Sequence, residues 1–125
     1  MQQGTTILIV DDEKIIRDVV TLLLRRAGYR VLSAASGPEA LDLVRATGEL
    51  IELAVLDLVM PNLGGVRLLS RLRGIQPGMR ALFISGYDTP LGLPNSAAFL
   101  SKPFTAAELL RAVGDTGRRA IAQTA

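Results

Sequence analysis

The chain has 125 residues, a formal net charge of +2 at pH 7 and a pI of about 9.5, and its length is that of one domain. It contains 0 Cys and 0 His, which excludes disulfides, a typical zinc site, Ser-His-Asp or Cys-His catalysis and a phosphohistidine of its own. Hydrophobic residues make up 49% and charged residues 21%, a composition typical of a folded domain and not of a disordered tail.

Neither a membrane nor a nucleic acid is indicated as a direct partner. No apolar run approaches the roughly 20 residues of a membrane span, and the N-terminus lacks the basic and apolar regions of a secretion signal. The basic residues are scattered over the predicted helices, and only 4% of the residues are aromatic, so no basic stripe or stacking platform is visible. We therefore expect a cytoplasmic domain with a solvated surface of mixed charge.

Apolar runs and amphipathic stretches alternate along the first half of the chain. Residues 7–10 are too few for a helix and are rich in branched side chains, which predicts a buried parallel strand. Polar residues recur at helical spacing over 14–27, and Gly28 follows as the glycine that ends this helix. A second strand is predicted over 30–34. The sequence Ser36-Gly37-Pro38-Glu39 is a capping box with proline in the first turn, and it predicts a helix to about residue 46.

The second half continues the alternation, except between its last two strands. Strands are predicted over 53–56, 81–84 and 97–100, with a short helix over 66–73 and a last helix that begins at the capping box Thr105–Glu108. Between the last two strands, residues 87–96 contain Pro90, Gly92 and Pro94. Each interior proline destabilises a helix by about 3 kcal/mol and the glycine by about 1 kcal/mol, which predicts a loop or at most a single turn.

This order of elements predicts an α/β fold, doubly wound and flavodoxin-like. Five parallel strands in the order 2-1-3-4-5 would be covered by helices on both faces, with a degenerate or missing fourth helix. We expect a single domain over residues 5–122, with terminal tails at 1–4 and 123–125. In this topology the ligand site lies at the carboxyl ends of strands 1 and 3.

Polar residues follow four of the predicted strands, at the ends that would share one edge of the sheet. They are Asp11, Asp12, Glu13, Asp57, Ser85 and Lys102. Each alone has an ordinary explanation, such as a helix cap for Asp12, a turn for Ser85 and a solvated loop cation for Lys102. Asp57 is harder to explain in this way, because it directly follows the apolar run 53–56, where a carboxylate is partly buried.

Together these residues predict phosphoryl-transfer chemistry. The carboxylates of Asp11, Asp12 and Asp57 would repel one another unless a cation joined them, and hard oxygen ligands with open positions for water favour Mg²⁺. One carboxylate could then attack a phosphoryl group and form an acyl phosphate. The Lys102 ammonium and the Ser85 hydroxyl could neutralise and position the phosphoryl oxygens.

From Ile7 to about Val113 the sequence resembles the receiver domain of two-component response regulators. Four motifs in order and at the proper spacing carry the resemblance: Asp11-Asp12, then Asp57 with Met60-Pro61 and Gly65, then Phe83-Ile84-Ser85-Gly86-Tyr87, and finally Lys102-Pro103-Phe104. The third motif is most similar to the receiver of a hybrid sensor histidine kinase, and a stand-alone regulator fits the sequence equally well.

The resemblance implies a role for each acidic residue. Asp57 would be the phosphoacceptor. Asp12 and Asp57 would bind Mg²⁺ directly, together with the backbone carbonyl of Val59, and Asp11 would act through water. The phosphoryl donor would be a phosphohistidine on a histidine kinase or on a histidine phosphotransfer protein. The domain would not be an enzyme by itself, although it would hydrolyse its own acyl phosphate.

The resemblance also implies a two-state switch. A cis Lys102–Pro103 bond would point the lysine inward, and phosphorylation would draw the Ser85 hydroxyl inward so that Phe99 rotates into the vacated space. We expect a monomer, because the proline-rich segment 87–96 removes part of the usual dimer surface. Partner recognition would then use the first helix and the loop after the fifth strand.

Other functions of such a fold lack their motifs here. There is no G-x-G-x-x-G after strand 1, no Walker lysine and no G-x-S-x-G at Ser85. An aspartyl phosphatase of the haloacid type has a second Asp two residues after its nucleophile, where this chain has Val59. The remaining alternative is an unphosphorylated pseudo-receiver that acts only as a protein-interaction module.

Overall fold

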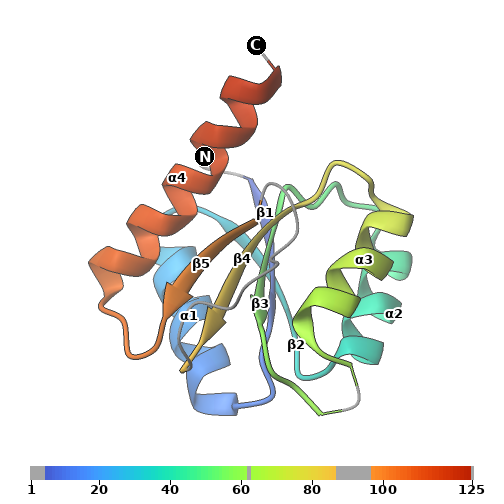
Figure 1. Cartoon of the computed structure of the whole chain (residues 1–125), viewed down its shortest axis with the longest axis horizontal. Coiled ribbons are helices and arrows are strands. Elements are labelled where there is room, and N and C mark those ends of the chain that lie inside the picture. Colours follow the sequence, from blue (N-terminus) through green and yellow to red (C-terminus); the bar gives the residue numbers. More distant parts are fainter. Residues whose placement is uncertain (1–4, 62, 87–96, 125) are drawn as a thin grey trace.

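The computed structural model describes residues 5–61, 63–86 and 97–124, in which strands and helices alternate as predicted (Figure 1). The strands are β1 (Thr6–Val10), β2 (Arg30–Ala34), β3 (Leu53–Asp57), β4 (Arg80–Ser85) and β5 (Ala97–Ser101). The helices are α1 (Lys14–Arg26), α2 (Gly37–Thr47), α3 (Gly65–Ile75) and α4 (Ala106–Thr124). The strand bounds match the predicted ones to within one residue at either end.

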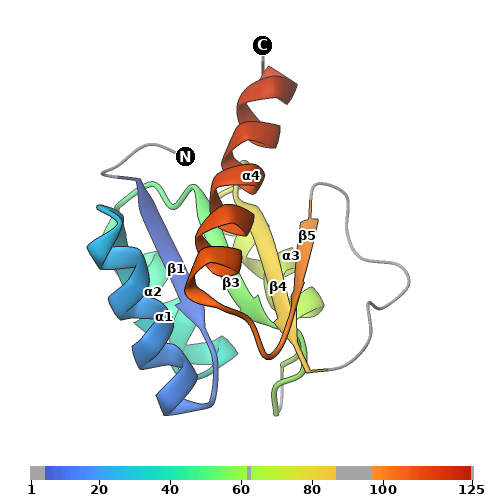
Figure 2. The same cartoon turned by 90° about the vertical axis from the view of Figure 1, so that its left-hand side faces the viewer.

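The five strands form one parallel sheet in the order β2-β1-β3-β4-β5, which confirms the predicted flavodoxin-like topology. Figures 1 and 2 show α1 and α4 on one face of this sheet and α2 and α3 on the other. Side chains alternate between the two layers: in β1, Ile7 and Ile9 pack under α1 and α4, while Leu8 and Val10 pack under α2 and α3. Because both faces are covered, the three inner strands β1, β3 and β4 are almost continuous apolar runs.

Local signals explain where three of the helices begin or end. Gly28 has a φ of 97°, which glycine adopts without strain, and it follows the last residues of α1. At the start of α4, the Glu108 N–H donates to Thr105 Oγ1 at 3.0 Å and the Thr105 N–H donates to Glu108 Oε1 at 2.9 Å, so the predicted capping box is confirmed. At the start of α2, the Glu39 N–H donates to the Ser36 hydroxyl at 3.2 Å, which caps this helix.

The junction between β3 and α3 depends on a glycine. A Cβ atom at Gly65 would lie 2.6 Å from the carbonyl oxygen of Asp57 and 3.2 Å from the ring of Phe83. The Gly65 N–H also donates to the Leu58 carbonyl at 3.1 Å. The absence of a side chain therefore lets α3 begin directly against the end of β3, and this fixes the loop that leaves Asp57.

The segment over which the sequence predicts a loop instead of a helix, 87–96, lies outside the described residues. The predicted loop, and the monomeric state argued from it, therefore stay predictions. In the part of the chain that the structure describes, no helix combines the length and the apolar character needed to cross a membrane.

Candidate functional site

Three carboxylates meet at the carboxyl edge of the sheet, where the sequence places them. Asp11 follows the last residue of β1, and Asp57 is the last residue of β3, the strand that pairs with β1. Asp11, Asp12 and Asp57 each place one carboxylate oxygen within 4.8 Å of the others. Asp11 and Asp57 are buried, and of the three Asp12 alone is open to solvent.

The Asp57 carboxylate is buried beside other negative charge. The residue is only 5% exposed, and its Oδ1 accepts a hydrogen bond from the Val59 N–H at 3.1 Å. Burial and then the charge of Asp11 raise the pKa of Asp57 from 3.8 to about 6, against the opposing effects of the Val59 N–H and the Lys102 charge. At neutral pH the group is therefore mostly ionised and available as a nucleophile.

Asp11 is held in one orientation by partners on both carboxylate oxygens. Its Oδ1 accepts from the Glu13 N–H at 2.8 Å, and its Oδ2 lies 3.4 Å from the Lys102 ammonium. Its backbone carbonyl accepts from the Arg17 guanidinium at 2.8 Å, which ties the loop to α1. Burial raises the pKa of Asp11, and the bond from Glu13 and the charge of Lys102 oppose this rise only in part.

The Lys102 ammonium lies among three carboxylates. Its Nζ is 3.3 Å from Glu13 Oε1, 3.4 Å from Asp11 Oδ2 and 3.6 Å from Asp57 Oδ2. The Lys102–Pro103 peptide bond is cis, as the resemblance implies. Burial alone would lower the pKa of Lys102, but the charges of Asp11 and Asp57 and the contact with Glu13 together raise it above its ordinary value. Lys102 is therefore a cation throughout the neutral pH range.

The two predicted switch residues lie on neighbouring strands. Ser85 ends β4, is buried, and accepts a hydrogen bond on its carbonyl from the Lys102 N–H at 2.8 Å. Phe99 lies opposite Phe83 in the pairing of β4 with β5 and is partly buried against the core under α2 and α3. Ser85 thus belongs to the site, and Phe99 packs in the layer beside it.

A cavity of about 380 Å³ opens onto these residues. Its lining consists of Asp12, Glu13, Asp57, Val59, Ser85, Gly86 and Lys102. Sequence reasoning assigns no role to Glu13 or Gly86. The only signal for Glu13 is its position directly after the Asp11-Asp12 pair, because its contact with Lys102 is created by the fold.

The donor set fits a magnesium ion. The carboxylates of Asp11, Asp12 and Asp57 lie together, and the Lys102 ammonium pairs with two of them, Asp11 and Asp57, so this group of carboxylates has an excess of negative charge. Mg²⁺ prefers hard carboxylate oxygens, and ligands on opposite sides of one such ion lie about 4 Å apart. A spread within 4.8 Å is therefore close to what one ion requires.

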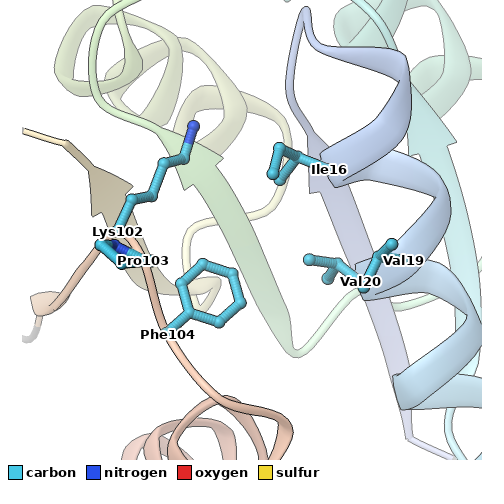
Figure 3. Close-up of a pocket in the computed structure, with 6 residues that line it drawn as sticks. All are labelled: Ile16, Val19, Val20, Lys102, Pro103 and Phe104. Atoms are coloured by element: carbon cyan, nitrogen blue, oxygen red, sulfur yellow. The ribbon is translucent and has the colours of Figure 1, made fainter.

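An apolar groove lies next to this cluster, between α1 and the segment that follows β5 (Figure 3). The cavity has a volume of about 320 Å³ and is lined by Ile16, Val19, Val20, Lys102, Pro103 and Phe104. Figure 3 shows Phe104 on the opposite side of the groove from Val20, with Lys102 leading away from it. Val19 is also one of three large apolar side chains of α1 that are exposed at helical spacing, together with Ile15 and Leu22.

Comparison with known proteins identifies the class to which this fold and site belong. The model of a family described as the response regulator receiver domain matches residues 7–114. The chain belongs to this family, whose members are the receivers of two-component systems. The resemblance seen in the sequence is thus confirmed.

The particular relatives include both a hybrid kinase and small regulators. The sensor kinase CckA of Brucella abortus (strain 2308) is 38% identical over 88% of this chain, and the chain spans 12% of that protein. CpdR, a response regulator receiver protein of the same strain, is 30% identical over 86% of this chain and 92% of its own length. A solved receiver domain from the hybrid histidine kinase CckA superposes with a TM-score of 0.79 at 37% identity, covering 89% of this chain and 97% of that one.

Among the curated relatives, the chain often matches only part of the protein. It spans 47% of the protein named "Probable transcriptional regulatory protein TcrX" of Mycobacterium tuberculosis (strain ATCC 25618 / H37Rv), which is 29% identical over 86% of this chain. A CheY-like receiver from Methanospirillum hungatei JF-1 superposes with a TM-score of 0.83 at 28% identity, covering 97% of this chain and 99% of that one. The same domain thus occurs in relatives both alone and as part of longer proteins.

Proposed function

We propose that residues 5–122 form a phosphoacceptor domain, which takes a phosphoryl group from a phosphohistidine onto Asp57. In this step the P–N bond of the donor breaks and the imidazole keeps its electron pair, while an Asp57 carboxylate oxygen bonds to phosphorus to give an acyl phosphate. The observation that carries the proposal is the burial of Asp57 next to Asp11 and within 3.6 Å of the Lys102 ammonium.

The side chains around Asp57 suit the charge of the transferred group. Lys102 would neutralise one phosphoryl oxygen, and the Ser85 hydroxyl would donate a hydrogen bond to another. Asp12, Asp57 and the Val59 carbonyl would hold Mg²⁺ directly, with Asp11 acting through water. When bound, this ion would supply the remaining charge neutralisation. The excess of carboxylates over cations in the cluster supports this assignment.

Phosphorylation would then act through the neighbouring strand. We propose that a phosphoryl group on Asp57 draws the Ser85 hydroxyl inward, so that Phe99 turns toward the space that it leaves. The partly buried position of Phe99 on β5, in register with the same strand that carries Ser85, supports this role.

We propose a histidine kinase or a histidine phosphotransfer protein as the partner, docked through a helix on the groove beside α1. The groove leads from Phe104 to Lys102, so a helix seated there would carry its phosphohistidine next to the cluster. The exposed apolar residues Ile15, Val19 and Leu22 extend the same surface along α1. They offer the apolar contact that a helical partner needs.

Phosphoryl uptake tests the proposal directly. The wild-type chain should gain one phosphoryl group from acetyl phosphate when Mg²⁺ is present, as measured by mass spectrometry, and should lose this ability when the metal is chelated. Asp57→Asn should gain none. The matched control is Asp42→Asn, because this carboxylate on α2 is 84% exposed and lies outside the cluster.

Two outcomes would contradict the proposal. Uptake by Asp57→Asn would place the acceptor elsewhere. A wild-type chain that takes up no phosphoryl group and shows no Mg²⁺-dependent response to beryllofluoride would instead be a pseudo-receiver that acts only as an interaction module.

A further inference from the structure

Glu13 occupies the N-cap position of α1 without acting as a cap. N-cap residues are typically Ser, Thr, Asp or Asn, whose short side chains accept a hydrogen bond from the first turn of the helix. Glu13 has the extended backbone of an N-cap, with φ −88° and ψ 111°, but its side chain makes no capping bond. Its carboxylate reaches across the site, where Oε1 lies 3.3 Å from the Lys102 ammonium. The side chain is thus used for a contact between α1 and the end of β5.

Lys102 is shared by its three carboxylate partners and is closely bound to none of them. Its distances of 3.3, 3.4 and 3.6 Å all exceed the roughly 2.8 Å of a strong charge-assisted hydrogen bond. The partners differ in exposure: the Glu13 side chain is 62% exposed, whereas those of Asp11 and Asp57 are 0% and 7% exposed. Glu13 therefore attracts the ammonium toward solvent, and the buried Asp11 and Asp57 attract it toward the interior.

A phosphoryl group on Asp57 would change this balance. It would bring further negative charge and strong acceptor oxygens to the interior side of Lys102, while the single charge of Glu13 would stay the same. We propose that Glu13 is a positioning residue that holds Lys102 at the exposed side of the site until the phosphoryl group draws the ammonium inward. This inference rests on the proposed phosphoryl transfer to Asp57.

The chain offers a clean spectroscopic test because it contains only two lysines, Lys14 and Lys102. The Cε–Hε signals of these lysines can be followed by heteronuclear NMR, and Lys14 serves as the internal reference. In Glu13→Gln without ligands, the chemical shift of the Lys102 signal should move away from that of the ligand-free wild type. It should move toward the value that the wild type has with Mg²⁺ and beryllofluoride bound. Asp18→Asn is the matched control, since Asp18 pairs with Lys14 at 2.6 Å, and it should move the Lys14 signal alone.

The functional readout is the beryllofluoride concentration at half-saturation in the presence of Mg²⁺. Glu13→Gln removes the ion pair between Lys102 and the exposed Glu13 carboxylate. Because Lys102 then no longer has to leave Glu13, the midpoint should fall about two- to fivefold. The midpoint of Asp18→Asn should stay at the wild-type value.

Glu13→Asp separates positioning from charge. This variant keeps the negative charge but is one methylene shorter, and Asp at an N-cap turns its carboxylate toward the N–H groups of the helix. It should therefore lower the midpoint as Glu13→Gln does. If charge near the site were the only effect of Glu13, the midpoint of Glu13→Asp would equal that of the wild type, and positioning would be refuted.

Three further results would contradict either the role of Glu13 or the proposed function. An unmoved Lys102 signal in Glu13→Gln, or a moved signal with a wild-type midpoint, would reduce Glu13 to a structural contact and overturn the inference. A wild-type chain without any response to Mg²⁺ and beryllofluoride would overturn the proposed function itself, which is a distinguishable result.

Discussion

Replacing Asp57 by Asn is expected to stabilise the folded chain while it abolishes phosphoryl uptake. Folding raises the pKa of Asp57 from 3.8 to about 6, because burial and the charge of Asp11 oppose ionisation. The difference between 3.8 and about 6 corresponds to about 3 kcal/mol of unfavourable free energy in the ionised folded state. Asn has nearly the same shape without the charge, and its oxygen can still accept the Val59 N–H. The substitution should therefore remove most of this unfavourable free energy.

The stability difference between wild type and Asp57→Asn should depend on pH with a definite sign. Below about pH 3.8 the carboxyl group is protonated in both the folded and the unfolded chain, so its titration contributes nothing. As the pH rises from about 4 to 6, the unfolded chain releases the proton while the folded chain retains it, and the wild type loses stability. Its deficit should reach about 3 kcal/mol at pH 7.5 and about half that value at pH 5.

Urea unfolding followed by circular dichroism, without divalent ions, measures this difference. Asp42→Asn is again the control, because its exposed carboxylate should leave the free energy of unfolding nearly unchanged at both pH values. Adding Mg²⁺ should narrow the gap, since the ion binds the complete carboxylate set and so stabilises the folded wild type more. Equal stability of wild type and Asp57→Asn at pH 7.5, or a gap that shrinks as the pH rises, would refute the reasoning.

Two further predictions concern the lifetime of the acyl phosphate and the junction after β3. Val59 and Tyr87, two residues after Asp57 and Ser85, carry no amide or carboxylate that could orient a water, so the acyl phosphate should be long-lived. The double variant Val59→Asn, Tyr87→Glu should speed its decay by on the order of tenfold or more, and an unchanged or slower decay would count against this explanation. Gly65→Ala should destabilise the chain by about 1–3 kcal/mol in thermal unfolding, whereas Gly74→Ala in the same helix, with no atom in its way, should be neutral or stabilising; equal effects would contradict the steric argument.

Much of the fold could be predicted because its signals are local. Short branched runs, helical spacing and two capping boxes lie within a few residues of the elements that they specify, and the sheet order follows from the alternation. The details that depend on distant partners were less predictable. The sequence places the end of the third strand at Leu56, but the strand includes Asp57, which pairs with Ile84 of β4.

The candidate site likewise has some features that the sequence predicts and others that it does not. That Asp11, Asp57 and Lys102 meet follows from one rule, since residues after parallel strands lie at the same edge of the sheet. The contact between Glu13 and Lys102 follows from no such rule, because it depends on the reach of two long side chains from different segments. The raised pKa of Asp57 likewise requires the degree of burial and the distance to Asp11, and these exist only in the folded chain.

The electrostatics of the cluster favour the phosphoacceptor over the interaction module. Domains of this size are stable by about 5–15 kcal/mol, so the roughly 3 kcal/mol assigned to the Asp57 charge is a large fraction of the total. A module that only docked partners would be more stable with a neutral residue at this position, and docking on the groove beside α1 does not require Asp57. In a phosphoacceptor the same repulsion is useful, because it favours binding of a cation next to the carboxylate that would attack phosphorus. The destabilising charge is thus what the proposed phosphoryl transfer requires, whereas neither folding nor docking on the groove requires it.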